Sequence, residues 1–354
     1  MTGVFEGIVG QERALGALTA AAASGRIHHA WIFHGPAGVG KFTAAHRFAR
    51  ALLTPGVTVR GGVMRAPTGG LVADTHPDLH VITKELARHS SDASVRARKL
   101  TSIPKEVLVE RLIRPAALGA TAAAAGLAKK VFLVDEAELI APVAQNALLK
   151  TLEEPPAGSV VILVTANEEL LLPTIRSRCQ GTAFAALDES ALRSWLEASG
   201  LGVTGDEREW LLAAACGSPG ALAAAHESGL AGALATLEPM LAEAEAGRFD
   251  TGLGAALAAT VEDWATQEVE RRKADNPSKD AANKAAARRL ERVLLERARR
   301  RLRQACASDA LARDRALRDI EIVTRAERDI RANVNLKLAL ENLAAQLAQA
   351  DGSG

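Results

Sequence analysis

The sequence predicts an α/β domain with a parallel sheet, followed by two helical domains. In the first half, short apolar runs rich in β-branched and aromatic residues alternate with helical patterns. This alternation is typical of a parallel sheet that helices cover on both faces. Strand patterns stop after about residue 183, and the periodicity of the rest is almost entirely helical. The length of 354 residues allows two or three domains.

Four strands and three helices are predicted in the first half. Near-continuous apolar runs indicate strands buried on both faces, and they lie at residues 30–34 (AWIFH), 131–135 (VFLVD) and 160–165 (VVILVT), with a weaker candidate at 80–82. Helical periodicity spans residues 11–24, 41–53 and 141–153. The glycine-rich stretch 54–75 is predicted to be a loop or small excursion, and 116–127 is predicted to be a connection.

The second half is predicted to contain helices at residues 187–199, 206–216 and 221–227, then nearly continuous helix over 231–349 with breaks near 247–254 and 275–279. Gly217-Ser218-Pro219-Gly220 is strong punctuation between two of these helices. The predicted domains are therefore an α/β domain at 1–182, a small helical domain at 183–228, a larger helical domain at 229–350 and a tail at 351–354.

Composition and charge exclude several classes of protein. The formal net charge of +1 implies no electrostatic grip on nucleic acid by the chain as a whole. Cys179, Cys216 and Cys306 are too few and too dispersed for a disulfide framework or a four-thiolate zinc site. No secretory signal is visible, and no apolar run approaches the roughly 18 residues of a membrane-spanning helix. We therefore expect a soluble, cytoplasmic protein.

A phosphate-binding loop is predicted between the strand 30–34 and the helix 41–53. Gly35-Pro-Ala-Gly38-Val-Gly40-Lys41 matches the pattern G-x-x-x-x-G-K. Glycines let backbone N–H groups turn toward a phosphate, while the helix N-terminus and a lysine supply positive charge. The alternative is a glycine-rich turn that binds no ligand, and the strand before the loop and the helix after it disfavour this interpretation.

The next position of the loop departs from the pattern of an active ATPase. It ordinarily carries Ser or Thr, whose hydroxyl ligates Mg²⁺, whereas this chain has Phe42. Thr43 would lie about 100° around the helix and is a poor substitute. The pattern therefore permits ATP or ADP at a degenerate site and predicts absent or weak hydrolysis.

Acidic residues follow the second predicted strand. Asp135 and Glu136 end the run VFLVDE and resemble the segment that delivers an aspartate to the metal and a glutamate to the attacking water in P-loop ATPases. An acidic turn after a buried strand is the alternative when this segment is considered alone. Its spacing from the predicted P-loop favours the ATPase-like interpretation.

Three further segments carry a family resemblance. They are NALLKTLEEPP at 146–156, LPTIRSRC at 172–179, and HAW at 29–31 after Val9-Gly10-Gln11. Together they closely resemble bacterial clamp-loader subunits of the AAA+ class, and within that class they resemble the delta-prime family of DNA polymerase III most. The resemblance covers about residues 4–182, and it returns at 333–336 (NVNL), which is similar to the family's last collar helix.

The resemblance implies a fold, partners and a role for one arginine. The domains would be an AAA+ P-loop domain, a helical lid and a helical collar that assembles with gamma/tau and delta subunits in a five-subunit ring. Such rings open a sliding clamp and place it on primer-template DNA as part of the DNA polymerase III holoenzyme. Arg178 would be a trans arginine finger that reaches a neighbour's ATP, since a guanidinium stabilises charge on the transferring phosphoryl group. Cys179 is interpreted as a packing residue.

Two further departures distinguish this chain from the family's motor subunits. Motor subunits resemble the segment at 217–220 but place an arginine after Gly-Ser, whereas this chain has Pro219 and Gly220. Many relatives carry a four-cysteine zinc module, but no cysteine occurs at 52–80, so no zinc is expected. We therefore expect a non-catalytic, stator-type subunit. The alternatives are an active gamma/tau-like ATPase of the ring and a stand-alone AAA+ nucleotide-binding switch.

A basic stretch lies in the last predicted domain. Residues 271–303 contain 13 Lys or Arg and four Asp or Glu, a local balance of +9. One interpretation is contact with DNA or an acidic partner. The other, which is favoured, is a solvated helix face whose buried stripe is formed by Leu290, Val293, Leu294 and Leu302.

Overall fold

The computed structural model describes residues 3–97, 100–121, 126–227, 229–245, 248, 252–271, 278–305, 309–332 and 334–349. The chain forms two compact units. The first comprises Met1–Ser199 with Gly217–Gly220, and the second comprises Gly200–Cys216 with Ala221–Gly354. The first unit ends later than the predicted domain 1–182, and the division into three domains stays a prediction.

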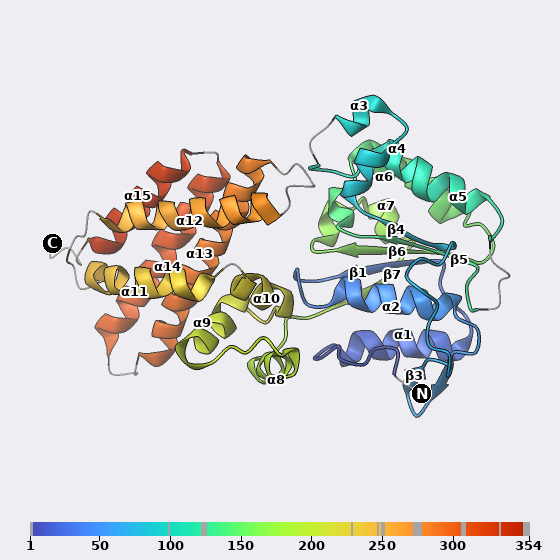
Figure 1. Cartoon of the computed structure of the whole chain (residues 1–354), viewed down its shortest axis with the longest axis horizontal. Coiled ribbons are helices and arrows are strands. Elements are labelled where there is room, and N and C mark those ends of the chain that lie inside the picture. Colours follow the sequence, from blue (N-terminus) through green and yellow to red (C-terminus); the bar gives the residue numbers. More distant parts are fainter. Residues whose placement is uncertain are drawn as a thin grey trace. The chain divides into compact units, whose positions relative to one another are not determined.

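A five-stranded parallel sheet forms the centre of the first unit (Figure 1). Its strand order is β4-β5-β6-β1-β7, and the strands are β4 (Leu79–Ile82), β5 (Lys130–Val134), β6 (Ser159–Thr165), β1 (Ala30–His34) and β7 (Gln180–Ala183). In the register, Ala30 lies opposite Val161, and Val131 lies opposite Val160. β5 and β6 are buried along their whole length, which explains their near-continuous apolar sequences.

Helices cover both faces of this sheet, as Figure 1 shows. α1 (Glu12–Ser24) and α2 (Lys41–Leu53) pack with Trp31 and Phe33 of β1 in one core. Ile32 points to the opposite core, which contains Leu108 and Leu148 from helices on the other face. Successive strand residues alternate between the two cores because side chains of a strand alternate in direction. The predicted fold class is thus confirmed.

The opposite face carries α4 (Lys105–Leu108), α5 (Arg114–Ala117), α6 (Pro142–Glu153) and α7 (Pro173–Arg176), and α3 (Ala93–Arg96) lies nearby in the sequence. A π-helical turn at Val109–Ile113 joins α4 to α5. This helical run was not predicted, and it overlaps the start of the predicted connection 116–127, of which 122–125 lie outside the described residues. Short 3₁₀ turns occupy Lys84–His89, Ala137–Leu139 and Glu168–Leu170.

Two further strand features differ from the sequence prediction. β7 at the sheet edge was not predicted. Within the stretch 54–75, β2 (Thr58–Arg60) and β3 (Val63–Arg65) form an antiparallel hairpin, so the small excursion exists and contains strands. The hairpin turns at Gly61 and Gly62, which both have positive φ, as a type I′ two-residue hairpin loop requires.

The second unit is helical among its described residues. It contains α9 (Gly205–Ala215), α11 (Leu230–Glu245), α12 (Gly252–Arg271), α13 (Lys279–Gln304), α14 (Ala310–Arg331), α15 (Leu336–Ala348) and most of α10 (Pro219–Glu227), while α8 (Glu189–Ser199) belongs to the first unit. α12 packs against α13 and α15, and α13 packs against α14. No described helix has both the length and the apolarity to cross a membrane.

Candidate phosphate-binding site

The loop between β1 and α2 has the backbone conformation that its glycines predict. Gly35, Gly38 and Gly40 have φ of 134°, 74° and 96°, values that side chains other than hydrogen rarely permit. At Gly35 the steric reason is direct, because a Cβ there would lie 2.0 Å from the carbonyl oxygen of Phe184. The loop therefore needs glycine at this position to approach the chain that follows β7.

Lys41 begins α2 and is only 6% exposed. Its Nζ donates hydrogen bonds to the carbonyl oxygens of Gly35 (2.6 Å) and Pro36 (2.5 Å). Burial lowers the pKa of Lys41, and the negative charges of Glu138 and Asp135 oppose this shift. The ammonium group is thus held at the loop with two acidic groups close enough to favour its charged form.

Asp135 and Glu136 follow β5 and face different partners. The Glu136 N–H donates to Oδ1 of Asp135 (2.9 Å). Burial raises the pKa of Asp135, and the negative charges of Glu136 and Glu138 add to that effect. Glu136 has left-handed backbone dihedrals with φ of 47°, and its Oε2 accepts a hydrogen bond from Nζ of Lys84 at 2.5 Å. The carboxylate of Glu136 is therefore neutralised by a lysine that follows β4.

Three residues at this site were missed by the sequence analysis. Oε1 of Glu138 accepts the Ala166 N–H (3.2 Å), and its buried Oε2 has no hydrogen-bond donor among the described residues. Thr165, the last residue of β6, is buried and its hydroxyl accepts the Asn167 N–H (3.1 Å). Trp195 of α8 also lines the site. Strand-end position was a usable signal for Thr165, and Glu138 belongs to the same acidic segment as Asp135 and Glu136. Nothing local marked Trp195.

These elements surround a cavity of about 510 Å³. Of the predicted site residues, Gly38, Gly40, Lys41, Asp135 and Glu136 line it together, while Gly35 contributes the carbonyl that receives Lys41. The volume lies within the range of about 300–1000 Å³ that is usual for ligand sites. The structure thus brings a glycine loop, one lysine and three carboxylates to one cavity.

Phe42 also lines the cavity. The residue is 36% exposed, and its ring stacks on His46 with centroids 5.8 Å apart. Phenylalanine supplies no oxygen for a hard cation. Thr43 lies on the cavity lining as well, so the following residue of α2 carries a hydroxyl.

The segment Gly217–Gly220 returns to the phosphate-binding loop. Oγ of Ser218 donates to the carbonyl of Ala37 (2.8 Å), and the Gly220 N–H donates to the carbonyl of Gly38 (2.9 Å). Pro219 and Gly220 line the cavity. Pro219 and Gly220 therefore lie next to the phosphate-binding loop, at the position where we expected motor subunits to carry an arginine.

Arg178 lies outside this cavity lining, on the turn after α7. Its Nη2 lies 2.7 Å from Oε1 of Glu153, and its Nη1 donates to the carbonyl of Thr174 (2.8 Å). These contacts hold the guanidinium at the surface, where the side chain is 34% exposed. Cys179 packs against the core, and burial raises the pKa of its thiol to about 12. The interpretation of Cys179 as a packing residue is confirmed.

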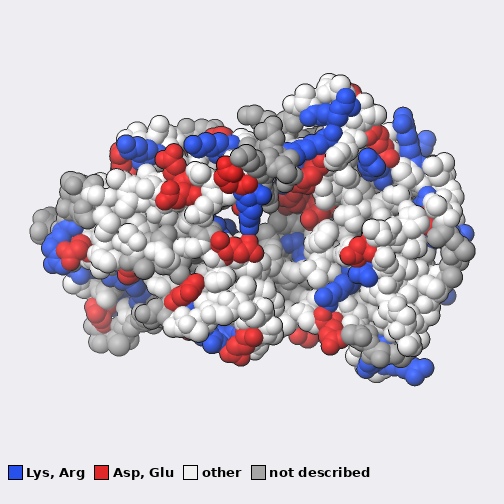
Figure 2. All heavy atoms as spheres, viewed as in Figure 1, with Lys and Arg blue, Asp and Glu red and all other residues white. Residues whose placement is uncertain are grey.

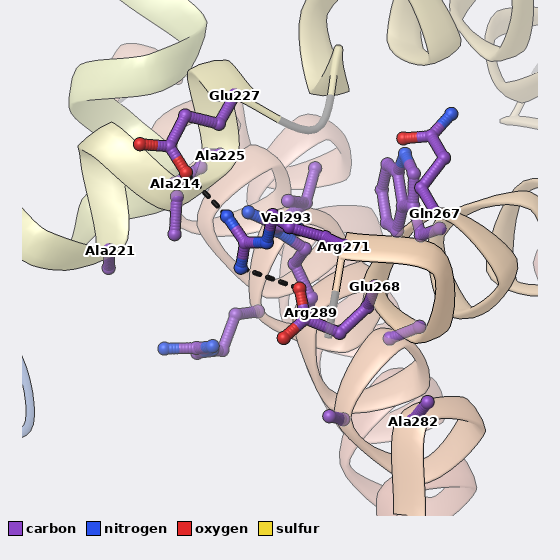
Figure 3. A pocket seen from close by; sticks show the side chains of 15 residues that line it. Ala214, Ala221, Ala225, Glu227, Gln267, Glu268, Arg271, Ala282, Arg289 and Val293 are labelled. Carbon is purple, nitrogen blue, oxygen red and sulfur yellow. Dashed lines mark hydrogen bonds and ion pairs between the residues drawn. The ribbon is translucent and has the colours of Figure 1, made fainter. Parts of the chain in front are cut away.

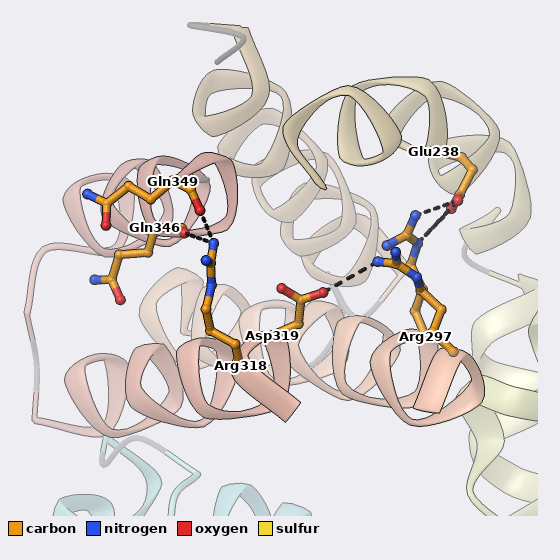
Figure 4. Close-up of polar contacts among 7 residues, drawn as sticks. Glu238, Arg297, Arg318, Asp319, Gln346 and Gln349 are labelled. Atoms are coloured by element: carbon orange, nitrogen blue, oxygen red, sulfur yellow. Dashed lines mark hydrogen bonds and ion pairs between the residues drawn. The ribbon is translucent and has the colours of Figure 1, made fainter. Parts of the chain in front are cut away.

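Many cations of the basic stretch 271–303 pair within the second unit. Arg297 of α13 lies on Glu238 of α11 (Figure 4), with Nη2 2.7 Å from Oε1. Nη1 of Arg301, also of α13, lies 3.4 Å from Oδ2 of Asp319 of α14. Leu290, Val293 and Leu294 are buried as predicted, and Leu302 is half-buried. Figure 2 shows Lys and Arg interspersed with Asp and Glu on the face in view. The solvated-face interpretation thus omitted these carboxylate partners.

In the described part of the chain, no group of three or more His, Cys, Asp or Glu side chains could hold a metal ion. His80 stacks on Phe132 with centroids 4.7 Å apart, and Nδ1 of His76 accepts the Asp78 N–H. Cys306 lies outside the described residues. The expectation of no zinc stays a prediction.

Known proteins similar in sequence to this chain include DNA polymerase III subunits. Over 192 residues it is 33% identical to subunit delta' of Pseudomonas aeruginosa, covering 54% of this chain and 53% of that protein. Over 194 residues it is 34% identical to subunit tau of Escherichia coli, covering 54% of this chain and 27% of the relative. The matched region thus spans between about a quarter and a half of these relatives.

A solved structure and a family model give two further comparisons. A gamma subunit-related protein from Thermotoga maritima aligns over 96% of this chain and 99% of its own, with 16% identity and a TM-score of 0.48. The family described as "DNA polymerase III, delta subunit" matches residues 10–188, which is half of the chain and includes Lys41, Asp135 and Arg178. The chain therefore belongs to the DNA polymerase III delta subunit family.

Proposed function

We propose that this chain is a non-catalytic, stator-type subunit of the sliding-clamp loader in DNA replication. The observation that carries the proposal is Phe42, which occupies the lining position where a P-loop ATPase needs a metal-ligating hydroxyl. Family membership supports the assignment to a clamp loader. A subunit that cannot place Mg²⁺ at its own site can still contribute to a neighbour's.

The chain's own cavity would hold ATP or ADP without appreciable hydrolysis. Backbone groups at Gly38 and Gly40 and the ammonium of Lys41 are suited to phosphate. Two features oppose turnover: Phe42 offers no metal ligand, and the carboxylate of Glu136 is engaged by Lys84. Bound nucleotide would then act as a structural ligand. A titration with and without Mg²⁺ tests this, since we expect binding that Mg²⁺ strengthens little.

Arg178 would act on a neighbouring subunit as a trans arginine finger. Its guanidinium lies outside the chain's own cavity lining and is oriented by Glu153 and the carbonyl of Thr174. A planar, permanently charged group held at the surface is suited to a phosphoryl group that another protein presents. The neighbours would be gamma/tau and delta subunits in a five-subunit ring, and the sliding clamp and primer-template DNA would be engaged through that complex.

A second candidate is an active motor subunit of the same ring. The observation that favours it is the 34% identity to subunit tau of Escherichia coli, which is as high as the identity to delta'. In that case the chain would hydrolyse ATP through Lys41 and Asp135, with Thr43 in place of the missing hydroxyl. The isolated chain would then show substantial ATP turnover.

DNA-dependent ATPase activity distinguishes the two candidates. We expect the isolated chain to show little turnover, and the complex reconstituted with gamma/tau and delta subunits to be active. Arg178→Ala should lower turnover at the site it serves on the order of 10³-fold, the effect typical of an arginine finger. Substantial turnover by the isolated chain would contradict the stator role.

Arg193→Ala is a matched control for Arg178→Ala. Arg193 belongs to the same unit, has a similarly exposed side chain (33%) and also pairs with a glutamate, Glu189, at 2.8 Å. The control complex should retain full turnover. If the two variants have the same ATP turnover in the complex, or if Arg178→Ala leaves that turnover unchanged, the finger assignment is wrong.

A further inference from the structure

The second unit contains a cavity of its own, of about 330 Å³, among α9, α10, α12 and α13. Figure 3 shows it from close by. Much of its wall is alanine, including Ala221, Ala225 and Ala282. Because a methyl group is all that these positions project, the helices leave a hollow instead of interdigitating. Its volume lies at the lower end of the range of about 300–1000 Å³ for ligand sites.

Three arginines and two glutamates line this hollow. Arg271 holds both glutamates: its Nη1 lies 2.6 Å from Oε2 of Glu227, and its Nη2 lies 2.6 Å from Oε2 of Glu268 (Figure 3). Both carboxylates of the lining are thus engaged by one guanidinium. Arg289 and Arg292 of α13 are the remaining cations of the lining, and they leave it with an excess of positive charge.

Arg289 lies half-buried beside the cavity, with its guanidinium carbon 5.5 Å from the ring centroid of Trp264. Neither Arg289 nor Arg292 forms an ion pair with a carboxylate within the described ranges. The two are three residues apart on one helix and therefore share a face. Burial lowers the pKa of Arg289 to about 10, and the charge of Arg292 adds to that shift. A nearby anion would relieve this repulsion.

We propose that this cavity binds phosphate, and that the guanidinium groups of Arg289 and Arg292 contact the phosphate oxygens. Guanidinium groups match phosphate oxygens in paired hydrogen bonds. A phosphate group has enough oxygens and charge to contact both arginines at once, whereas a carboxylate has two oxygens and one charge. The phosphate would come from a small phosphate ester or from the backbone of a nucleic-acid strand. This site lies wholly within the second unit and is independent of the P-loop cavity.

Calorimetric titration of the full chain with inorganic pyrophosphate tests the proposal. The chain carries Lys41→Ala, so that the P-loop does not contribute. We expect one saturable site, weakened roughly tenfold or more by Arg289→Ala, as the loss of a hydrogen bond to a charged group implies. Arg289→Lys, which keeps the charge and loses the planar fork, should bind with intermediate affinity. If Lys41→Ala does not fold, the same titration is done on the chain that keeps Lys41. Arg289→Ala must then remove one of its pyrophosphate-binding steps.

Arg288→Ala provides the matched control. Arg288 is the exposed neighbour of Arg289 on α13 and is absent from the cavity lining, so this variant should bind pyrophosphate normally. Competition identifies the source: displacement by a short oligonucleotide, lost in Arg289→Ala, supports nucleic acid, and resistance to it supports a small phosphate ester. The proposal is overturned if pyrophosphate shows no saturable binding, if Arg288→Ala weakens it equally, or if poly-glutamate binds more tightly than pyrophosphate.

Discussion

Asp135 and Lys41 lie in the same P-loop cavity, and burial acts on them in opposite directions. The pKa of Asp135 is raised and that of Lys41 is lowered, because transfer from water disfavours the charged form of each. Their opposite charges reduce both shifts without cancelling them. The cavity therefore holds charges at a cost in stability, as is common where groups are arranged for a ligand.

Replacing Asp135 with asparagine should stabilise the isolated chain at neutral pH. A carboxyl whose pKa is raised on folding makes the native state bind more protons than the unfolded state. Its contribution to the free energy of unfolding therefore declines as the pH rises above the ordinary carboxyl pKa of about 4. Asparagine does not ionise and can still accept the Glu136 N–H. In urea unfolding, Asp135→Asn should have a higher free energy of unfolding than the unchanged chain at pH 8, and this difference should shrink toward pH 4.

Asp188→Asn supplies a control of opposite sign. Hydrogen bonds from the Ala191 N–H and the Ser190 hydroxyl lower the pKa of Asp188. Its contribution to stability is therefore present above the ordinary carboxyl pKa and is lost as pH falls. Asp188→Asn should lose stability at pH 8, and a gain there of the size seen for Asp135→Asn would contradict the burial argument.

Motif residues and their partners differ in how far sequence could predict them. Gly38, Gly40 and Lys41 are fixed by one local turn, so their common position at the cavity followed from spacing. The pairing of Glu136 with Lys84 depends on β4 and β5 being neighbours in the sheet. Strand order is set by packing across the whole unit, and one stretch of sequence carries no signal for it.

At the scale of elements, the predictable strands were those buried on both faces. β1, β5 and β6 are long apolar runs at or near the middle of the sheet, and their predicted bounds differ from the observed ones by at most one residue. β7 has the sequence QGTA, lies at the edge and buries only Thr182. An edge strand with one covered face needs few apolar residues, so hydropathy alone did not reveal it.

The helical run from α4 to α5 was obscured by its prolines. Pro104 precedes α4 and Pro115 lies in the first turn of α5. Proline is tolerated at the first turn of a helix but usually ends one when it appears later. Here the π-helical turn at Val109–Ile113 lets one continuous run accommodate Pro115, and its wider spacing also breaks the 3.6-residue periodicity that sequence analysis detects.

The pair Arg297–Glu238 should contribute measurably to the attachment of α13 to α11 (Figure 4). Arg297 is only 11% exposed, and its Nε and Nη2 both donate to the carboxylate. A double-mutant cycle with Arg297→Met and Glu238→Gln, followed by urea unfolding, should give a coupling of about 1–2 kcal/mol. The exposed pair Arg193–Glu189 should give about 0.3–0.5 kcal/mol, and equal couplings would contradict the role assigned to burial.

At the scale of the whole molecule, the two units have separate cores and separate cavities. The first buries Trp31 between sheet and helices, and the second buries Trp264 among its helices. Two compact units that each bury their own apolar residues are expected to unfold as separate cooperative steps.

Denaturant unfolding should therefore resolve two transitions, and ADP should shift only one. Variants that retain Trp31 alone or Trp264 alone among the four tryptophans report each unit by fluorescence. ADP at 100 times its dissociation constant should stabilise the first unit by about 2.7 kcal/mol, and Lys41→Ala should abolish that shift. A single transition seen identically by both reporters, or an ADP effect on Trp264, would contradict this assignment.

The path of the chain through Gly217–Gly220 determines which fragments of the protein can contain the complete first unit. This tetrapeptide belongs to the first unit, whereas Gly200–Cys216 before it belongs to the second. A fragment that stops at Ser199 lacks the donors that Ser218 and Gly220 offer to the carbonyls of Ala37 and Gly38. Truncation at one point cannot yield a complete first unit free of the second, and a fragment intended to isolate the nucleotide site must graft these four residues back by a linker.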